Sequence, residues 1–150
     1  MEWLDRGIQN IINLFAYDVH IVQQDFNIYC SCRHHSNQAD PTCLKCLGTG
    51  HKIYIRSIKA YSEDHKQSVR QSFSSEPIVT TEYFIRSSYP VERKNILVEP
   101  AEAFVIHDLD HLKSRDRRFV YQLCYTYPKK ADNDVFMKNF YLLIKGGNDI

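Results

Sequence analysis

The sequence lacks long apolar segments and a large excess of charge of either sign. No apolar run approaches the ~18 residues of a membrane-spanning helix, so we expect no such span. The formal net charge of +1 argues against a protein that grips nucleic acid through a strongly basic surface. The first residues show neither the basic segment nor the apolar stretch of a secretory signal peptide. We therefore expect folding in a reducing cytosol, where disulfides are rare and clustered cysteines more often bind metal.

Tryptophan and methionine are scarce, with one and two residues, whereas tyrosine and phenylalanine number ten and eight. This Tyr-rich composition favours strands over helices. Hydrophobic residues make up 43% and charged residues 25% of the chain, as in ordinary globular proteins. The 150 residues suit a single domain, residues 1–150, that can bury a hydrophobic core without disulfides.

Residues 1–18 carry apolar side chains at three- and four-residue steps, which predicts an N-terminal amphipathic helix. The apolar stripe would consist of Leu4, Ile8, Ile11, Ile12 and Phe15, with Val19 at its end. Such a stripe packs either on the domain's own sheet or on another subunit, and the sequence favours the first arrangement.

Most of the remaining chain shows the alternation of apolar and polar residues that is typical of strands. We expect strands over residues 19–23, 52–58, 79–85, 95–98, 103–106, 119–127 and 135–144. Short strands separated by turn residues predict a mainly β fold, a small antiparallel β-barrel or sandwich whose body spans residues 52–145. The alternation slips near Ser57 and Ile58, which predicts a bulge or a bend. Residues 62–76 are polar, and we expect an exposed loop or an arm that reaches a neighbour.

Four of the five cysteines form a C-x-C pair and a C-x-x-C pair: Cys30, Cys32, Cys43 and Cys46. Thiolates at such spacings are ligands of tetrahedral zinc. Gly48 and Gly50 follow the second pair, and glycine permits the positive φ angles that let backbone amides approach the sulfurs. Because four thiolates leave no open coordination position, we expect a structural zinc that folds an inserted loop over residues 30–50.

Alternatives remain open for this cluster. His34 or His35 could complete a site of three cysteines and one histidine, and His51 is also near in sequence. The sulfurs could instead be free thiols or a redox pair. The fifth cysteine, Cys124, lies in the 119–127 segment, and we expect it to be a small buried hydrophobic residue.

Residues 107–111 form a second group of metal-ligand types, with the sequence HDLDH. On a helix, His107 and His111 would share one face and could hold a catalytic metal, as in a hydrolase. The segment follows a short predicted strand and precedes a basic run that ends at Arg118, which favours an exposed polar loop instead. No other nucleophile or acid–base pair is evident, so we expect a protein that is not an enzyme.

The segment CSC…DPTCLKCLGTGHK resembles the cysteine-rich element of small neck proteins of tailed bacteriophages, of the head-closure or head-to-tail connector type. In that pattern an N-terminal helix and a short strand lead into C-x-C, a D-P turn, C-x-x-C-x-G-x-G and a β-barrel. The matching residues are Asp40, Pro41, Cys43, Cys46, Gly48 and Gly50. The element C-x-x-C-x-G-x-G is also similar to the repeat of the Hsp40 co-chaperone zinc domain, which carries several such repeats where this chain has one.

The phage resemblance implies a virion structural protein, assembled in the host cytoplasm. It implies a homo-oligomeric ring between portal and tail that closes or connects the DNA-filled head. Residues 62–76 and 107–118 would contact neighbouring subunits and the portal or adaptor and tail proteins. Genome DNA would make transient, non-specific contact with such a ring.

A small zinc-containing module that binds nucleic acid or protein is the alternative function. It is motivated by basic and imidazole side chains beside the cysteines: Lys45, His51, Lys52 and Arg56. For nucleic acid, this alternative predicts binding that weakens as salt is added.

Overall fold

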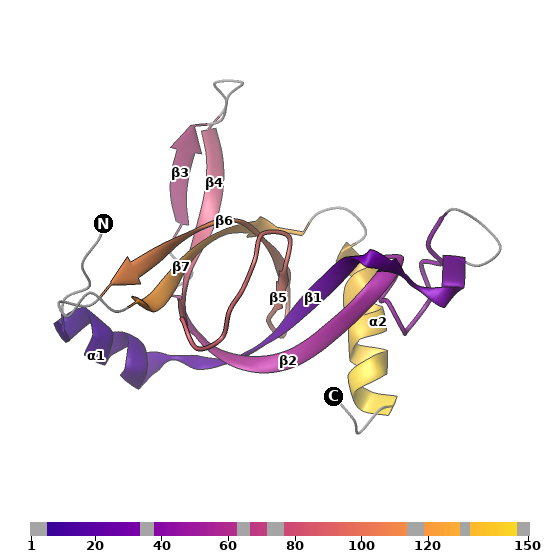
Figure 1. Cartoon of the computed structure of the whole chain (residues 1–150), viewed down its shortest axis with the longest axis horizontal. Helices are drawn as coiled ribbons and strands as arrows, with labels where there is room; N and C mark the ends of the chain where they lie inside the picture. Colours follow the sequence, from indigo (N-terminus) through magenta and orange to yellow (C-terminus); the bar gives the residue numbers. More distant parts are fainter. Residues whose placement is uncertain are drawn as a thin grey trace.

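The computed structural model of the chain describes residues 6–33, 38–62, 67–71, 77–113, 119–129 and 133–146 (Figure 1). Helix α1 (Arg6–Phe15) leads into two long strands, β1 (Tyr17–Tyr29) and β2 (His51–Tyr61). The 3-10 turn η1 (Ser31–Arg33) follows β1 directly. The remaining elements are β3 (Gln67–Gln71), β4 (Pro77–Arg86), β5 (Ile96–Val98), β6 (Ala103–Lys113), β7 (Phe119–Pro128) and helix α2 (Asn133–Gly146).

Six of these strands pair around a closed ring. Their order is β2-β1-β5-β6-β7-β4, and every pairing is antiparallel. The ring closes where β4 returns to β2, through the pairs Ala60–Ile85 and Tyr61–Phe84. β3 pairs with β4 outside the ring. The expected mainly β, antiparallel fold with an N-terminal helix is therefore confirmed.

The ring encloses the largest hydrophobic cluster, to which β1, β2, β4, β5, β6 and β7 all contribute. Its buried members are Val19, Ile21, Ile58, Ala60, Tyr83, Ile85, Val91, Leu97, Phe104, Ile106 and Cys124. The expectation that Cys124 is a buried hydrophobic residue is confirmed, because its side chain is fully enclosed in this cluster.

The two helices cover the outer face of the ring at different places. Phe136, Met137 and Phe140 of α2 pack on the outward-facing side chains of β1, β5 and β6. On α1, Ile12 is buried against Leu112 and Tyr121. The side-chain oxygen of Asn13 accepts hydrogen bonds from Arg86, at 3.0 Å, and from the hydroxyl of Tyr121. In Figure 1, α1 lies at one end of the long axis, and the loop that follows β1 lies at the other.

The slip of alternation in β2 is not a bulge. The pairing of β1 with β2 is regular from Tyr17–Ala60 to Asp25–Lys52, with no shift at Ser57 or Ile58. The reason is that β2 is buried on both faces in turn. Ile53 and Ile55 face outward toward α2, whereas Ile58 and Ala60 face the ring interior.

The strand predicted over residues 135–144 is wrong, because this segment lies in helix α2. Its buried side chains, Phe136, Met137 and Phe140, follow the helical spacing of one and four residues, whereas Tyr141 and Leu142 are exposed. A dense run of apolar residues satisfies a strand pattern as well as a helical one, and the sequence pattern did not separate them. Residues up to 145 are therefore not all part of the β body.

Other boundaries also differ from expectation. The expected helix 1–18 ends at Phe15 in the described chain, and Val19 belongs to β1 and the core; residues 1–5 lie outside the described residues. The expected loop 62–76 contains β3, while residues 63–66 and 72–76 lie outside the description.

Candidate metal centre

The four clustered cysteines lie on a loop that leaves the ring at the end of β1. Cys30 follows Tyr29 directly, and Cys32 lies in η1. Cys43 and Cys46 lie on the turns that lead back to β2. The backbone N–H of Cys30 donates to the carbonyl of Gly50 at 2.9 Å, so the two ends of the loop are tied together.

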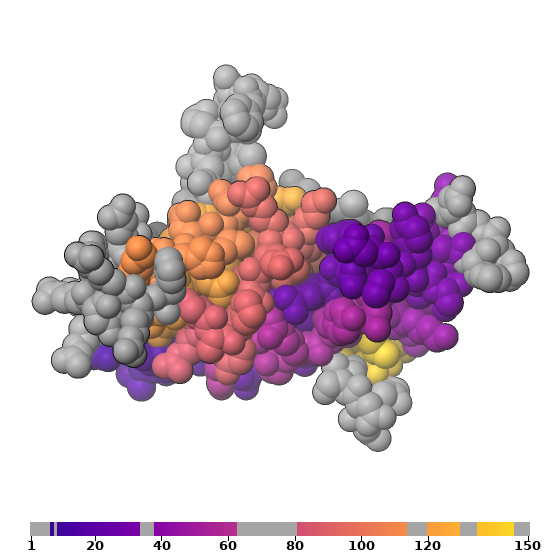
Figure 2. All heavy atoms as spheres, viewed as in Figure 1, coloured from indigo at the N-terminus to yellow at the C-terminus, as the bar shows by residue number. Residues whose placement is uncertain are grey.

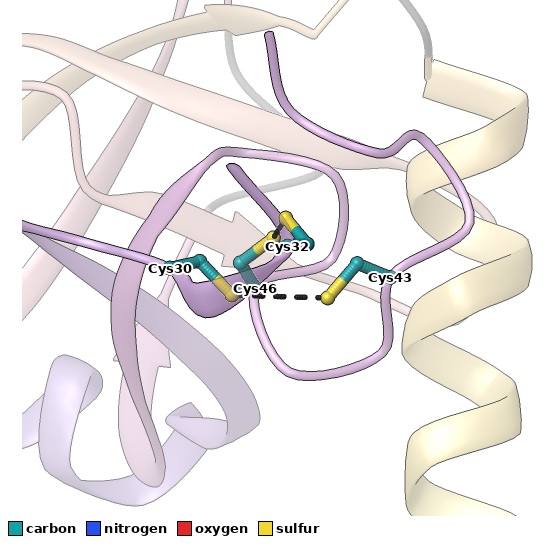
Figure 3. Close-up of side chains that lie close together, drawn as sticks. All are labelled: Cys30, Cys32, Cys43 and Cys46. Carbon is teal, nitrogen blue, oxygen red and sulfur yellow. Dashed lines mark hydrogen bonds between the residues drawn. The ribbon is translucent and has the colours of Figure 1, made fainter. Parts of the chain in front are cut away.

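The sulfurs of these cysteines point toward one another (Figure 3). The distance from Sγ of Cys30 to that of Cys43 is 3.8 Å, and from Cys32 to Cys46 it is 3.6 Å. All four sulfurs lie within 4.8 Å of one another, and none forms a disulfide. The predicted grouping is therefore present, and it could hold one metal ion.

The turn after Cys46 is built on positive φ angles, as the two glycines predict. Gly48 has φ of 80° and Gly50 has φ of 81°. A Cβ at Gly48 would lie 3.1 Å from the carbonyl oxygen of Pro41, so a side chain there would crowd the Pro41 backbone. The same turn is closed by hydrogen bonds from the backbone and the hydroxyl of Thr49 to the carbonyl of Cys46, at 3.0 and 2.7 Å.

The electrostatics of the cluster differ from sulfur to sulfur. Burial alone would raise the pKa of the Cys30 thiol, but hydrogen bonds from the Cys32 backbone and from the neighbouring cysteines lower it to about 7. Burial raises the pKa of Cys46 to about 12, and the adjacent sulfurs add to this despite a backbone hydrogen bond from Gly50. Four ionised thiols at these distances repel one another, so a cation among them is the natural means of holding all four as thiolates.

Helix α2 supports this loop from outside, which the sequence did not predict. The side-chain amide of Asn139 donates to the carbonyl of Pro41 at 2.6 Å. Leu47, next to Cys46, is buried in the cluster formed by α2 and the outer face of the ring. Within the loop, Asp40 accepts hydrogen bonds from the backbone and the hydroxyl of Thr42, at 2.9 and 2.8 Å.

The histidines considered as alternative ligands are placed as follows. His34 and His35 lie outside the described residues. The His51 ring packs between Phe26 and Tyr29, with ring centroids 5.0 and 5.4 Å away. His51 is not among the residues that group with the sulfurs.

The HDLDH segment does not form the helix that a catalytic metal site needs. Residues 107–111 belong to strand β6, and residues 114–118 lie outside the description. Asp108 pairs with Arg93 at 3.0 Å, and Asp110 accepts a hydrogen bond from Tyr125 at 2.8 Å. Among the described residues, the four cysteines are the only group close enough to share an ion.

Neither a scan of protein-family models nor a search of curated proteins finds a match to this chain. Neither helix in the described part of the chain has the length and hydrophobicity that a membrane crossing requires.

Proposed function

We propose that this protein is a non-enzymatic structural protein that assembles with copies of itself into a ring and holds one structural zinc ion per chain. The resemblance of its cysteine loop further suggests the neck of a tailed bacteriophage, between portal and tail, as the place of that ring. The proposal is supported by the chemistry of the metal centre and by two apolar surfaces at opposite ends of the molecule.

Zinc fits the cysteine cluster better than other common ions. Thiolates select zinc or related thiophilic metals, whereas calcium and magnesium require oxygen ligands. A tetrahedral site with zinc–sulfur bonds of ~2.3 Å places its sulfurs about 3.8 Å apart. The Sγ–Sγ separations of 3.8 Å (Cys30–Cys43) and 3.6 Å (Cys32–Cys46) agree with this value. Four sulfurs around one ion leave no position for a reactive water, so the ion stabilises the loop and does not catalyse.

The observation that carries the assembly proposal is the exposed apolar face of α1. Leu14 is 76% exposed and Phe15 is 60% exposed, and Ile11 lies on the same side of the helix. Beside them, a pocket of about 420 Å³ opens between α1 and the outer face of the ring, lined in part by Leu14, Phe84 and Tyr121. Contiguous exposed apolar side chains next to a pocket are typical of interaction sites.

The cysteine loop and the end of β1 lie at the other end of the long axis (Figure 2). Ile28 and Leu44 are exposed apolar side chains of this region. Association of two unlike surfaces is heterologous, and it produces rings when the rotation between copies closes. The α1 face of one copy could therefore contact the cysteine-loop end of the next copy, which would give a head-to-tail ring.

Oligomeric mass tests the proposal. Zinc-loaded protein should form a cyclic oligomer in light scattering and micrographs, alone or together with portal and tail proteins. Leu14→Glu should abolish assembly, because it places a charge in the interface. Leu142→Glu is the matched control, since Leu142 is an exposed leucine on α2, and this variant should still assemble. Monomers under every condition, with intact zinc, would contradict the assembly proposal.

A further inference from the structure

The end of the β1–β2 pair projects beyond the ring. β1 pairs with β5 only through residues 20–22, and β2 pairs with β4 only through Ala60 and Tyr61. The pairing of β1 with β2 is displaced between Asp25 and Tyr29, so residues 26–28 do not pair with β2. Two aromatic residues at this irregularity, Phe26 and Tyr29, have exposed side chains.

We name these side chains the arm patch: Phe26, Tyr29 and His51. Phe26 and Tyr29 are exposed, at 46% and 64%. Both of their rings contact the His51 ring, with centroid separations of 5.0 and 5.4 Å. Exposed aromatic rings in contact with one another form a surface on which further planar groups can stack.

A cation lies over each exposed ring of the arm patch. The Arg33 guanidinium lies 4.1 Å from the centroid of the Tyr29 ring. The Lys94 amine lies 5.2 Å from the centroid of the Phe26 ring. In the described part of the chain, Lys94 forms no ion pair.

Lys94 lies on the turn that precedes β5. Its φ is 72°, and its N–H donates to the carbonyl of Ile106 at 2.8 Å, so the turn is tied to β6. Two acidic side chains also lie in this part of the chain. Asp25 accepts a hydrogen bond from the backbone of Asn27 at 3.0 Å, and Asp40 accepts one from the backbone of Thr42 at 2.9 Å.

We propose that the arm patch binds single-stranded nucleic acid. Unpaired bases stack on the aromatic rings, and the phosphates pair with Arg33 and Lys94. Stacking favours a single strand over a duplex, in which the faces of the bases are already covered. The alternation of cations with rings favours a polyanion with planar groups over an acidic protein segment, which offers charge alone. The small net charge of the whole chain is compatible with this binding, because the cations are local to the patch.

Binding of a fluorescent oligothymidine to the zinc-loaded chain tests the proposal by anisotropy over a range of salt concentrations. Two phosphate contacts predict a slope of about −1.4 in a plot of log affinity against log salt. Phe26→Ala and Tyr29→Ala should each weaken binding at least about fivefold. Lys94→Gln should reduce the slope by about 0.7. Tyr127→Ala on β7 and Lys138→Gln on α2, which change side chains of the same types elsewhere, should bind like the unaltered protein.

Three results would overturn the proposal. The first is no binding at the lowest salt concentration. The second is equal affinity for a duplex with no effect of Phe26→Ala or Tyr29→Ala, since this would indicate phosphate contact alone. The third is full competition by oligoglutamate, with the aromatic variants equally impaired toward it, since this would indicate an acidic protein partner.

Discussion

At the scale of single residues, the cysteine loop depends on backbone conformations that few residues adopt. Leu47, Gly48 and Gly50 have φ angles of 54°, 80° and 81°. This run reverses the chain immediately after Cys46, so the backbone of Gly50 reaches the Cys46 sulfur and Leu47 reaches the cluster under α2. The glycines could be interpreted from sequence because only glycine adopts positive φ without steric cost, whereas the same conformation at Leu47 has no such signal.

Substitution of Gly48 tests this argument. Gly48→Ala should lower the free energy of unfolding by about 1–2 kcal/mol, because a Cβ is unfavourable at positive φ, and the crowding by Pro41 adds to that cost. The matched control is Gly7→Ala in helix α1, which should raise stability by about 0.5–1 kcal/mol, because alanine is the better helix former. Urea unfolding of the metal-loaded protein measures both. Equal effects of the two substitutions on the free energy of unfolding would contradict a requirement for glycine at position 48.

At the scale of elements, the sequence predicted features that depend on neighbouring residues, but not those that depend on contacts between distant parts of the chain. The cysteine grouping follows from spacing within one loop, and the strands from alternation in short segments. The helix α2 was misassigned because its buried residues, Phe136, Met137 and Phe140, stand in an apolar run that also fits a strand. Near Ser57 and Ile58 the sequence predicted a bulge or a bend, and the pairing shows no bulge. The alternation slips there because β2 buries its outer face under α2 before this point and its inner face in the core after it, which depends on the tertiary fold. The support of the loop by Asn139 joins residues 98 positions apart and left no sequence signal.

The contact between α2 and the loop gives a second prediction. Asn139→Ala removes the donor to the Pro41 carbonyl from a buried position and should cost about 1–2 kcal/mol of stability. It should also speed the transfer of metal to a coloured chelator, because the loop opens more often. Lys138→Ala, at the exposed neighbouring position, should change stability by less than about 0.5 kcal/mol and leave the transfer rate unaltered. If both variants release metal at the same rate, α2 does not hold the loop.

At the scale of the whole molecule, the cysteine loop and the ring of strands are separate structural units. Of the loop residues that the structure describes, none belongs to the core inside the ring, and Leu47 alone belongs to the cluster under α2. Metal binding should therefore contribute to the folding of the loop and not to that of the ring. The two unlike ends of the molecule are likewise separate, since α1 packs on β6 and β7 and the loop projects from β1 and β2.

Removal of the metal by a chelator tests this separation. Before chelation, a thiol-alkylating reagent should modify none of the clustered cysteines, because their sulfurs are bound to the ion. After chelation it should modify Cys30, Cys32, Cys43 and Cys46, while Cys124 stays protected inside the ring at 0% exposure. The far-ultraviolet circular dichroism of the strands should persist, because the enclosed core is unchanged. Alkylation of Cys124 together with the other four would show that the ring unfolds with the loop, and alkylation of all four before chelation would show that the cluster binds no metal.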